Sequence, residues 1–266
     1  MVLNTMKYYL IIILLIIVCY YLMFNNNKLT KRVFVVTFEH NCKFSQLYLS
    51  LKLYLAGAYK VLSLNIDTLE APENIKEHIR NTKRGAGYWL WKPYAIKQVL
   101  NLAGENDIII YIDCKNDITH LDQLTDMIEN HGILVFKHMG GLYQSAWTKM
   151  DAVNYFEYPL TNWCQTEGPK IQFISAFIGF INNNNGRTLI ARWAESMDIK
   201  NIKLIDDSPG ELPNCSDFRE SRHDQQMLSL ILYKWYPELS NKLPIYNKKY
   251  GWLWHEKNTF SFFKII

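Results

Sequence analysis

An aromatic, glycine-containing and basic segment lies shortly before an apolar run that ends in a carboxylate. Residues 84–94 read RGAGYWLWKPY, and residues 107–113 read DIIIYID. Glycines let a backbone approach a ligand closely, arginine binds phosphate oxygens in a forked geometry, and flat rings pack on apolar surfaces. Buried strands of α/β enzymes present ligand contacts at their carboxyl ends. Together the two segments predict an enzyme that handles a nucleotide-activated sugar.

The donor-binding residues predicted from this pattern are aromatic, glycine, basic and acidic side chains around one strand end. Arg84 and Lys92 lie inside the aromatic segment, which favours phosphate binding, whereas Arg80 and Lys83 are typical of a solvated basic face. The full predicted set is Phe38, Arg84, Gly87, Tyr88, Trp91, Lys92 and Asp113.

A divalent metal is the second expectation. Asp113 and Asp117 lie four residues apart, and Mn²⁺ or Mg²⁺ bridging a nucleotide pyrophosphate prefers such oxygen ligands. His255 is a third candidate ligand. The alternative is that Asp113 only ends the strand and Asp117 caps the following helix.

The catalytic candidates are Asp224 and Gln225, directly before an apolar helical pattern. A carboxylate at this place could deprotonate an acceptor hydroxyl, although an aspartate at a helix start is also a common cap. Acceptor contacts are predicted at Trp147, Lys149 and Asp151, a group that could equally be a simple helix start.

Composition limits the protein class. The chain has 266 residues, and its net charge of +4 without a basic block argues against nucleic acid as a partner. The five cysteines include no CxxC pair, which argues against a zinc site. Up to two disulfides could form in an oxidising compartment, but no spacing requires them, so free thiols are expected.

An uncharged apolar run begins at Tyr8 and ends at Phe24. At 1.5 Å per residue it spans roughly 25 Å, which suits a single-pass anchor in a thin, endoplasmic-reticulum- or Golgi-type membrane. A cleaved signal peptide is the alternative, but no small-residue cleavage site follows. Flanking cations slightly favour a cytoplasmic catalytic domain, whereas the sequon at Asn214 permits a lumenal one. The orientation stays open.

The remaining chain alternates strand-like and helix-like patterns, which predicts an α/β domain with a mostly parallel sheet flanked by helices. Residues 1–31 are expected to form the anchor and linker, and residues 32–266 one catalytic domain. Strands are predicted at 31–38, 59–66, 107–112, 133–137 and 173–182. Helices are predicted at 45–55, 93–102, 121–130, 146–156, 188–197 and 224–235, a polar helix or loop at 71–83, and an irregular tail after residue 246.

The ordered segments resemble a group of proteins assigned as glycosyltransferases, found in bacterial capsular-polysaccharide loci and in large DNA viruses. Their motifs read roughly R-G-x-G-Y-W-x-W-K-P, Y-x-D-x-G, W-T-K-x-D and H-R-H-D-Q-S. The matching segments here are residues 84–94, 111–113, 147–151, 174–180 and 222–229, so the resemblance covers most of residues 32–236. For a protein of a large DNA virus, the resemblance implies that the anchor lies in a viral-factory membrane.

The resemblance implies a GT-A-like fold, a nucleotide-sugar donor, a glycan or glycoprotein acceptor, and an Asp-x-Asp-type metal site. It also implies that Asp224 and Gln225 contact the sugar. The chain departs from the group at Lys115, which leaves no Asp-x-Asp and could replace part of the metal's charge, and at Ser221. Rival hypotheses are an inactive glycan-binding membrane protein of the same fold and a nucleotidyltransferase, although the first strand lacks a glycine-rich nucleotide loop.

Overall fold

The computed structural model describes residues 29–246 and 254–256. The predicted anchor between Tyr8 and Phe24 lies outside these ranges, as does most of the tail expected to be irregular. Within the described ranges, no helix is both long and apolar enough to cross a bilayer.

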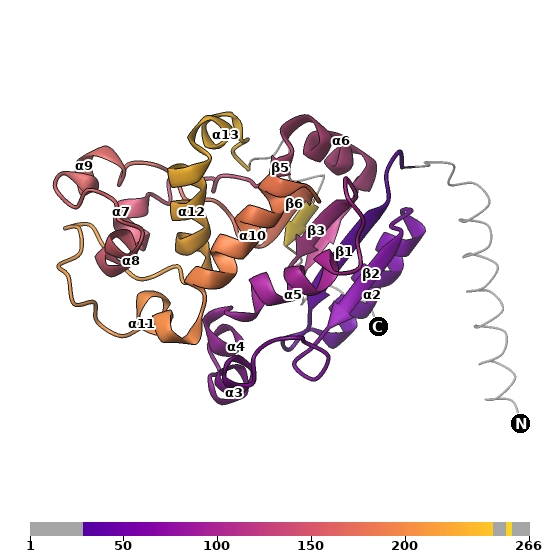
Figure 1. The fold of residues 1–266 in the computed structure, drawn as a ribbon, viewed down its shortest axis with the longest axis horizontal. Coiled ribbons are helices and arrows are strands. Elements are labelled where there is room, and N and C mark those ends of the chain that lie inside the picture. The colour runs from indigo at the N-terminus through magenta and orange to yellow at the C-terminus, as the bar shows by residue number, and fades with distance from the viewer. Residues whose placement is uncertain (1–28, 247–253, 257–266) are drawn as a thin grey trace, which may run out of the picture.

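A five-stranded sheet forms the centre of the fold (Figure 1). Its strands, in spatial order, are β2 (Lys60–Leu64), β1 (Val33–Phe38), β3 (Ile108–Ile112), β6 (Phe177–Ile181) and β5 (Ile133–Leu134). β1 pairs in parallel with both β2 and β3, whereas β6 is antiparallel to β3 and to β5. All strands except β6 therefore run in one direction, but only two of the four strand pairings are parallel, so the α/β prediction is confirmed with a mixed sheet in place of a mostly parallel one.

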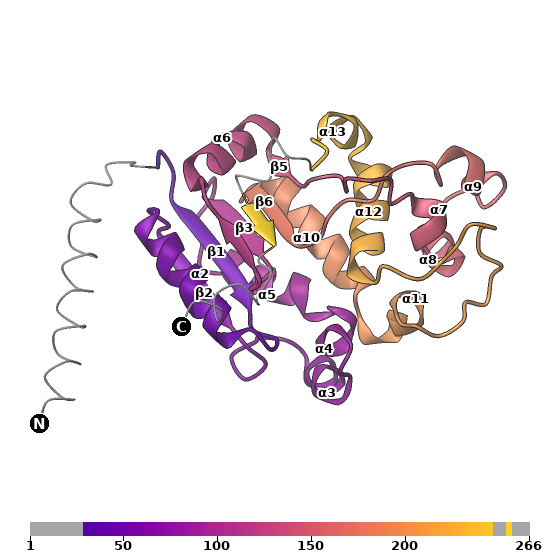
Figure 2. The ribbon, with the colours of Figure 1, turned by 180° about the vertical axis from the view of Figure 1, so that it is seen from behind.

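The central strands β1 and β3 are buried at every position, which is why nearly all of their residues are apolar. β1 reads VFVVTF and β3 reads IIIYI, a composition typical of strands that are covered on both faces. α5 (Trp91–Leu100) packs on β1 and β3, and α2 (Lys43–Leu55) packs on β2. α6 (Leu121–His131) covers β5 and β6, and α10 (Asn184–Ser196) lies against α5, as the two opposite views show (Figures 1 and 2).

The other half of the molecule is largely helical, with α7, α8, α9 and α11 at the end away from β2 (Figure 1). α12 (Asp224–Trp235) joins the two halves and, as predicted, begins at Asp224; its residues as far as Tyr233 are buried. The remaining helices are α3 (Glu73–Asn81), α4 (Gly85–Tyr88), α7 (Gln144–Trp147), α8 (Met150–Tyr155), α9 (Trp163–Thr166), η1 (Ile199–Asn201), α11 (Ile202–Ile205) and α13 (Pro237–Lys242).

Two local predictions were wrong. The helix expected at 146–156 is split into α7 and α8, because Thr148 and Lys149 are extended and the Lys149 backbone N–H donates to Gln226 Oε1 at 3.1 Å. A small second sheet was also missed, in which β4 (Asn116–Ile118) pairs with β7 (Trp254–Glu256). Such short strands are stabilised by distant partners and carry no local pattern of their own.

The expectation of free thiols is also wrong. Cys42 is bonded to Cys114 and Cys164 to Cys215, with Cα–Cα distances of 6.2 and 5.8 Å. The partners are 72 and 51 residues apart in the sequence, so only the fold brings them together. The first bond ties the segment after β1 to the residue that follows Asp113.

Reduction of these disulfides is expected to destabilise the domain. In the loop-closure model, each bond stabilises the folded state by about 4 kcal/mol for loops of these lengths. Thermal unfolding with and without a phosphine reductant tests this, and a Cys164→Ala/Cys215→Ala variant isolates the bond that is remote from β3. An unchanged melting temperature after reduction would contradict the bonded state.

Candidate active site

A cavity of about 570 Å³ opens beside the carboxyl ends of β1 and β3. These strands are parallel neighbours, with Val36 opposite Tyr111, so Phe38 and Asp113 emerge at the same edge of the sheet. Ligands of open α/β sheets bind at such an edge. Of the residues predicted to bind donor or to catalyse, the cavity is lined by Phe38, Arg84, Trp91, Lys92, Asp113, Asp224 and Gln225.

A buried ammonium lies between two carboxylates at the floor of the cavity. Lys92, in the first turn of α5, is 2% exposed, and its Nζ lies 3.3 Å from Asp113 Oδ1 and 2.9 Å from Asp224 Oδ2. The same nitrogen donates to the Ser175 carbonyl at 3.2 Å and lies 3.3 Å from the Ser175 hydroxyl. This cluster joins α5, the end of β3, the segment before β6 and the start of α12.

The Lys92 ammonium keeps its charge. Burial acts to lower the pKa of the Lys92 ammonium, but the charges of Asp113 and Asp224 outweigh it, and the pKa stays above its ordinary value. The Tyr111 hydroxyl donates to Asp113 Oδ1, and burial together with that carboxylate raises the tyrosine pKa well above its usual range. Tyr111 therefore remains a neutral donor that orients Asp113.

A left-handed backbone turn forms the wall above the cluster. Five successive residues have positive φ: Gly85 (56°), Ala86 (47°), Gly87 (81°), Tyr88 (56°) and Trp89 (61°). Its hydrogen bonds follow a helical pattern, with the Tyr88 N–H donating to Arg84 and the Trp89 N–H to Gly85. A left-handed conformation costs roughly 1–2 kcal/mol for each non-glycine residue. Strain of this size is concentrated at functional sites, which supports a role for this turn.

The turn positions an aromatic wall. Trp89 lines the cavity and stacks on His223 at 5.2 Å. Trp91 is buried, stacks on Phe38 at 4.1 Å, and donates from its ring nitrogen to the Gly85 carbonyl at 3.1 Å. Trp89, which sequence analysis did not single out, is thus the more accessible ring of the two.

Gly87 and Tyr88 do not line the cavity. A Cβ at Gly87 would lie 3.1 Å from the Ile79 Cα, so the glycine permits α4 and α3 to approach closely. Tyr88 packs beside His78 and His223, at 6.3 and 5.3 Å between ring centroids. Their contacts indicate that these two residues shape the turn.

Several cations line the cavity. Arg84 pairs with Asp207 at 3.0 Å and with Glu220 at 3.2 Å, which ties the left-handed turn to the segment before α12. Lys115 and Arg222 also line the cavity. Clustered arginine and lysine side chains suit the oxygens of a diphosphate.

Gln225 has an internal partner, since its Nε2 donates to Gln172 Oε1 at 2.9 Å. Several other lining residues, including Ser175, His40 and His138, are not among the residues predicted from the sequence. Ser175 lies within a run that was predicted to be strand, where a serine gives no distinguishing signal. Both histidines occupy loops that only the fold brings to the cavity.

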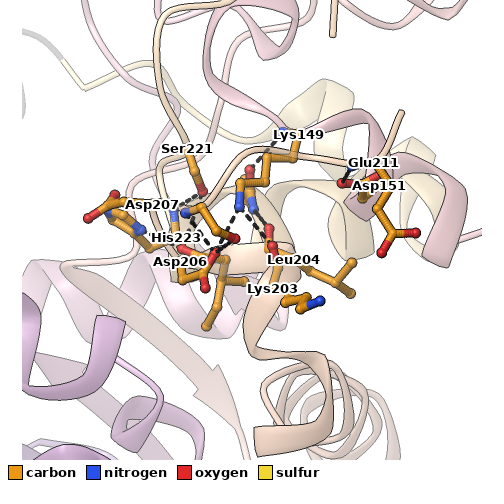
Figure 3. A network of polar contacts seen from close by, with 12 residues as sticks. Lys149, Asp151, Lys203, Leu204, Asp206, Asp207, Glu211, Ser221 and His223 are labelled. Carbon is orange, nitrogen blue, oxygen red and sulfur yellow. Dashed lines mark hydrogen bonds and ion pairs between the residues drawn. The ribbon is translucent and has the colours of Figure 1, made fainter. Parts of the chain in front are cut away.

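The predicted acceptor residues do not line this cavity, and Figure 3 shows Lys149 and Asp151 in a polar network that also contains Ser221 and His223 of the cavity lining. Lys149 Nζ donates to the Lys203 carbonyl at 2.7 Å and pairs with Asp206 at 3.0 Å. Asp151 accepts the backbone N–H groups of Glu211 and Leu212, both at 2.8 Å. Trp147 lies against the guanidinium groups of Arg219 and Arg222. These contacts fix the long segment before α12. Arg222, which Trp147 contacts, lines the cavity, and the acceptor role of the three residues stays a prediction.

The residues do not fit the expected Mn²⁺ or Mg²⁺ site. Asp117 does not line the cavity, and its carboxylate pairs with Lys52 at 2.9 Å. His255 is opposite Asp117 in the register of the separate β4–β7 sheet. Across the described part of the chain, no group of three or more His, Cys, Asp or Glu side chains could hold a metal ion. The Lys92 ammonium already occupies the space between Asp113 and Asp224.

Stability is expected to fall as the pH drops below neutrality. Burial lowers the pKa of His40, His78, His138 and His223 below the ordinary value of 6.5. Between the lowered folded values and 6.5, the unfolded chain binds more protons than the folded one, so the free energy of unfolding decreases with falling pH. Melting temperatures measured from about pH 7.5 to 5.5 should decline, and His138→Gln should flatten the decline. A melting temperature that does not change with pH would contradict the lowered pKa values of these four histidines.

Comparison with known proteins gives only distant similarities. No protein-family model and no curated protein matches the chain. Among solved structures, the apo form of mouse xyloside xylosyltransferase 1 is similar at 10% identity and a TM-score of 0.42, over 86% of this chain and 98% of that one.

A glycosyltransferase involved in glycosylation of the major capsid of PBCV-1 is similar at 11% identity and a TM-score of 0.40, over 86% of this chain and 94% of its own. The apo bifunctional glycosyltransferase WbbM is similar at 10% identity and a TM-score of 0.39, over 83% of this chain and 40% of its own. Similarities this distant carry no argument about activity, which rests on the site alone.

Proposed function

We propose that the protein is a glycosyltransferase that moves a sugar from a nucleotide diphosphate donor to a hydroxyl of a glycan or glycoprotein. The observation that carries this proposal is the cavity at the ends of β1 and β3, where a carboxylate pair lies beside cations and aromatic rings. Its volume of about 570 Å³ is within the usual range for a small-molecule ligand. The motifs shared with the resembling glycosyltransferases contribute most of these side chains.

The cations that line the cavity suit the diphosphate. Arg84, Lys115 and Arg222 would stabilise the negative charge that develops as the bond from the anomeric carbon to the diphosphate breaks. Trp89 offers a ring for the sugar or the base. Asp113, held by Tyr111 and Lys92, is placed to accept hydroxyl groups of the donor.

Asp224 is the candidate base. The acceptor hydroxyl forms the new bond to the anomeric carbon, its proton passes to the Asp224 carboxylate, and the nucleoside diphosphate leaves with the electron pair of the broken bond. Asp224 has Lys92 as its charged partner, whereas Asp113 is held by Lys92 and by Tyr111; this difference supports Asp224 as the proton acceptor and Asp113 as the positioning group.

We further propose that the domain is anchored by the apolar run between Tyr8 and Phe24 and faces an oxidising compartment. Two disulfides support that placement, because thiols are kept reduced in the cytosol. They weigh against the slight preference of the flanking charges for a cytoplasmic domain.

Nucleotide binding by the purified full-length chain is the test. UDP, GDP and their common sugar conjugates are titrated by calorimetry, and nucleotide release is followed with a panel of glycan acceptors. We expect saturable binding of one nucleotide class, and release that depends on acceptor.

A glycan-binding protein without activity would bind oligosaccharides and ignore UDP and GDP. A nucleotidyltransferase would instead release pyrophosphate from a nucleoside triphosphate and a sugar phosphate. Either result would overturn the proposed transfer reaction.

A further inference from the structure

The donor atoms around Lys92 form the kind of oxygen cage that a hard cation selects. Two carboxylate oxygens, a backbone carbonyl and a hydroxyl lie within 3.3 Å of one nitrogen. Oxygen-rich sets of carboxylates and carbonyls bind Mg²⁺, Mn²⁺ and Ca²⁺ in other proteins. Here the Lys92 ammonium, a positive charge of the protein itself, already lies among these four oxygen atoms.

Burial and neighbouring side chains hold the Lys92 ammonium in its position. Lys92 is 2% exposed and Asp224 is 5% exposed on their side chains, so water does not compete with this contact. The Lys92 Nζ also lies over the rings of Trp91 and Tyr111, at 5.9 and 5.5 Å from their centroids. A divalent cation would have to displace a charge that is covalently attached and surrounded by four oxygen atoms.

Other carboxylates near the cavity, within the ranges that the structure describes, already have a cation as partner. Asp117 pairs with Lys52, and Asp207 and Glu220 both pair with Arg84. The charge of a leaving diphosphate is met instead by Arg84, Lys115 and Arg222, which line the same cavity. Both tasks of a metal in such a site, joining the carboxylates and neutralising the diphosphate, therefore have protein cations in position.

We infer that the Lys92 ammonium takes the place of a divalent cation at Asp113 and Asp224, so that the nucleotide diphosphate is bound without metal. The part that concerns the nucleotide rests on the proposed function. Lys92 acts as a positioning residue, because it holds the two carboxylates that face the substrate.

The first test compares nucleotide binding to the full-length chain in EDTA and in Mn²⁺. If the nucleotide is bound without metal, its dissociation constants in EDTA and in Mn²⁺ should agree within about twofold. Binding that weakens more than about tenfold in EDTA overturns the inference and leaves the proposed transferase intact. Absence of binding in both conditions counts against the proposed function, and the second test then decides the inference alone.

The second test measures Mn²⁺ binding directly, by the electron paramagnetic resonance signal of free Mn²⁺. The wild-type chain should leave the signal unchanged, whereas Lys92→Met frees two carboxylates and should bind the ion. Lys149→Met is the matched control, since Lys149 is equally buried, pairs with Asp206 and lies outside the cavity. Uptake by the wild type, or no uptake by a folded Lys92→Met, overturns the inference.

Circular dichroism establishes whether Lys92→Met folds. If it does not, Lys92→Arg replaces it: the larger guanidinium keeps the charge, and this variant should bind nucleotide in EDTA and exclude Mn²⁺. Binding of Mn²⁺ by Lys92→Arg would overturn the inference.

Discussion

Asp224→Asn is expected to lower the turnover of sugar transfer by about 10²–10⁴-fold, the usual effect of losing a general base. The amide keeps the size of the side chain and can still accept from Lys92, but it cannot take the acceptor proton. Nucleotide affinity should change by less than about threefold, because the lost interaction develops only in the transition state. Initial rates at saturating donor and acceptor, with calorimetric binding of the nucleotide, measure the two effects separately.

Asp122→Asn is the matched control for this variant. Asp122 lies in the first turn of α6, as Asp224 lies in the first turn of α12, and it does not line the cavity. Its replacement removes only a favourable interaction with the helix dipole, worth about 0.3–1 kcal/mol. If Asp224→Asn lowered stability by this amount and left turnover unchanged, Asp224 would be a helix-start residue and not the base.

Gly85→Ala is expected to lower kcat/KM by about 10²-fold, the penalty of a misplaced binding group. A Cβ at Gly85 would overlap the ring of Trp89, and Gly85 has a φ of +56°. We expect a loss of about 1–2 kcal/mol for the left-handed conformation and about 1–3 kcal/mol for the overlap. The turn would have to move, together with Arg84 and Trp89. Urea unfolding and steady-state kinetics measure the two consequences.

Gly140→Ala separates the backbone effect from the overlap. Gly140 has a φ of +87°, and no heavy atom lies within 4 Å of the position its Cβ would take. This variant should show the conformational loss alone, with kinetics close to those of the wild type. Equal behaviour of the two variants would mean that the geometry of the left-handed turn does not matter for transfer.

Several elements could be predicted because their patterns are local. The apolar runs of β1 and β3 indicate buried parallel strands, and the apolar residues after Asp224 define α12. A carboxylate directly after β3 must emerge at the carboxyl edge of the sheet, so the place of Asp113 also follows from the sequence. The same reasoning brings Phe38 to that edge.

Long-range contacts could not be predicted in this way. The sequence marked Lys92 as a phosphate-binding cation, but its burial between Asp113 and Asp224 depends on how α5 and α12 pack. Asp117, four residues beyond Asp113, suggests a metal pair, yet it is turned to Lys52 on α2. The charge of a side chain can be read from the sequence, whereas the group that it pairs with depends on how the helices and strands pack.

The sequence alone therefore determined the class of fold, the strand end that carries Asp113, and the chemical character of the residues gathered there, because these follow from apolar periodicity and side-chain type. Only the tertiary structure decided the disulfide pairing, the left-handed turn and the position of the Lys92 ammonium. Each of these depends on groups far apart in the chain, and their distances are set by the packing of the whole domain.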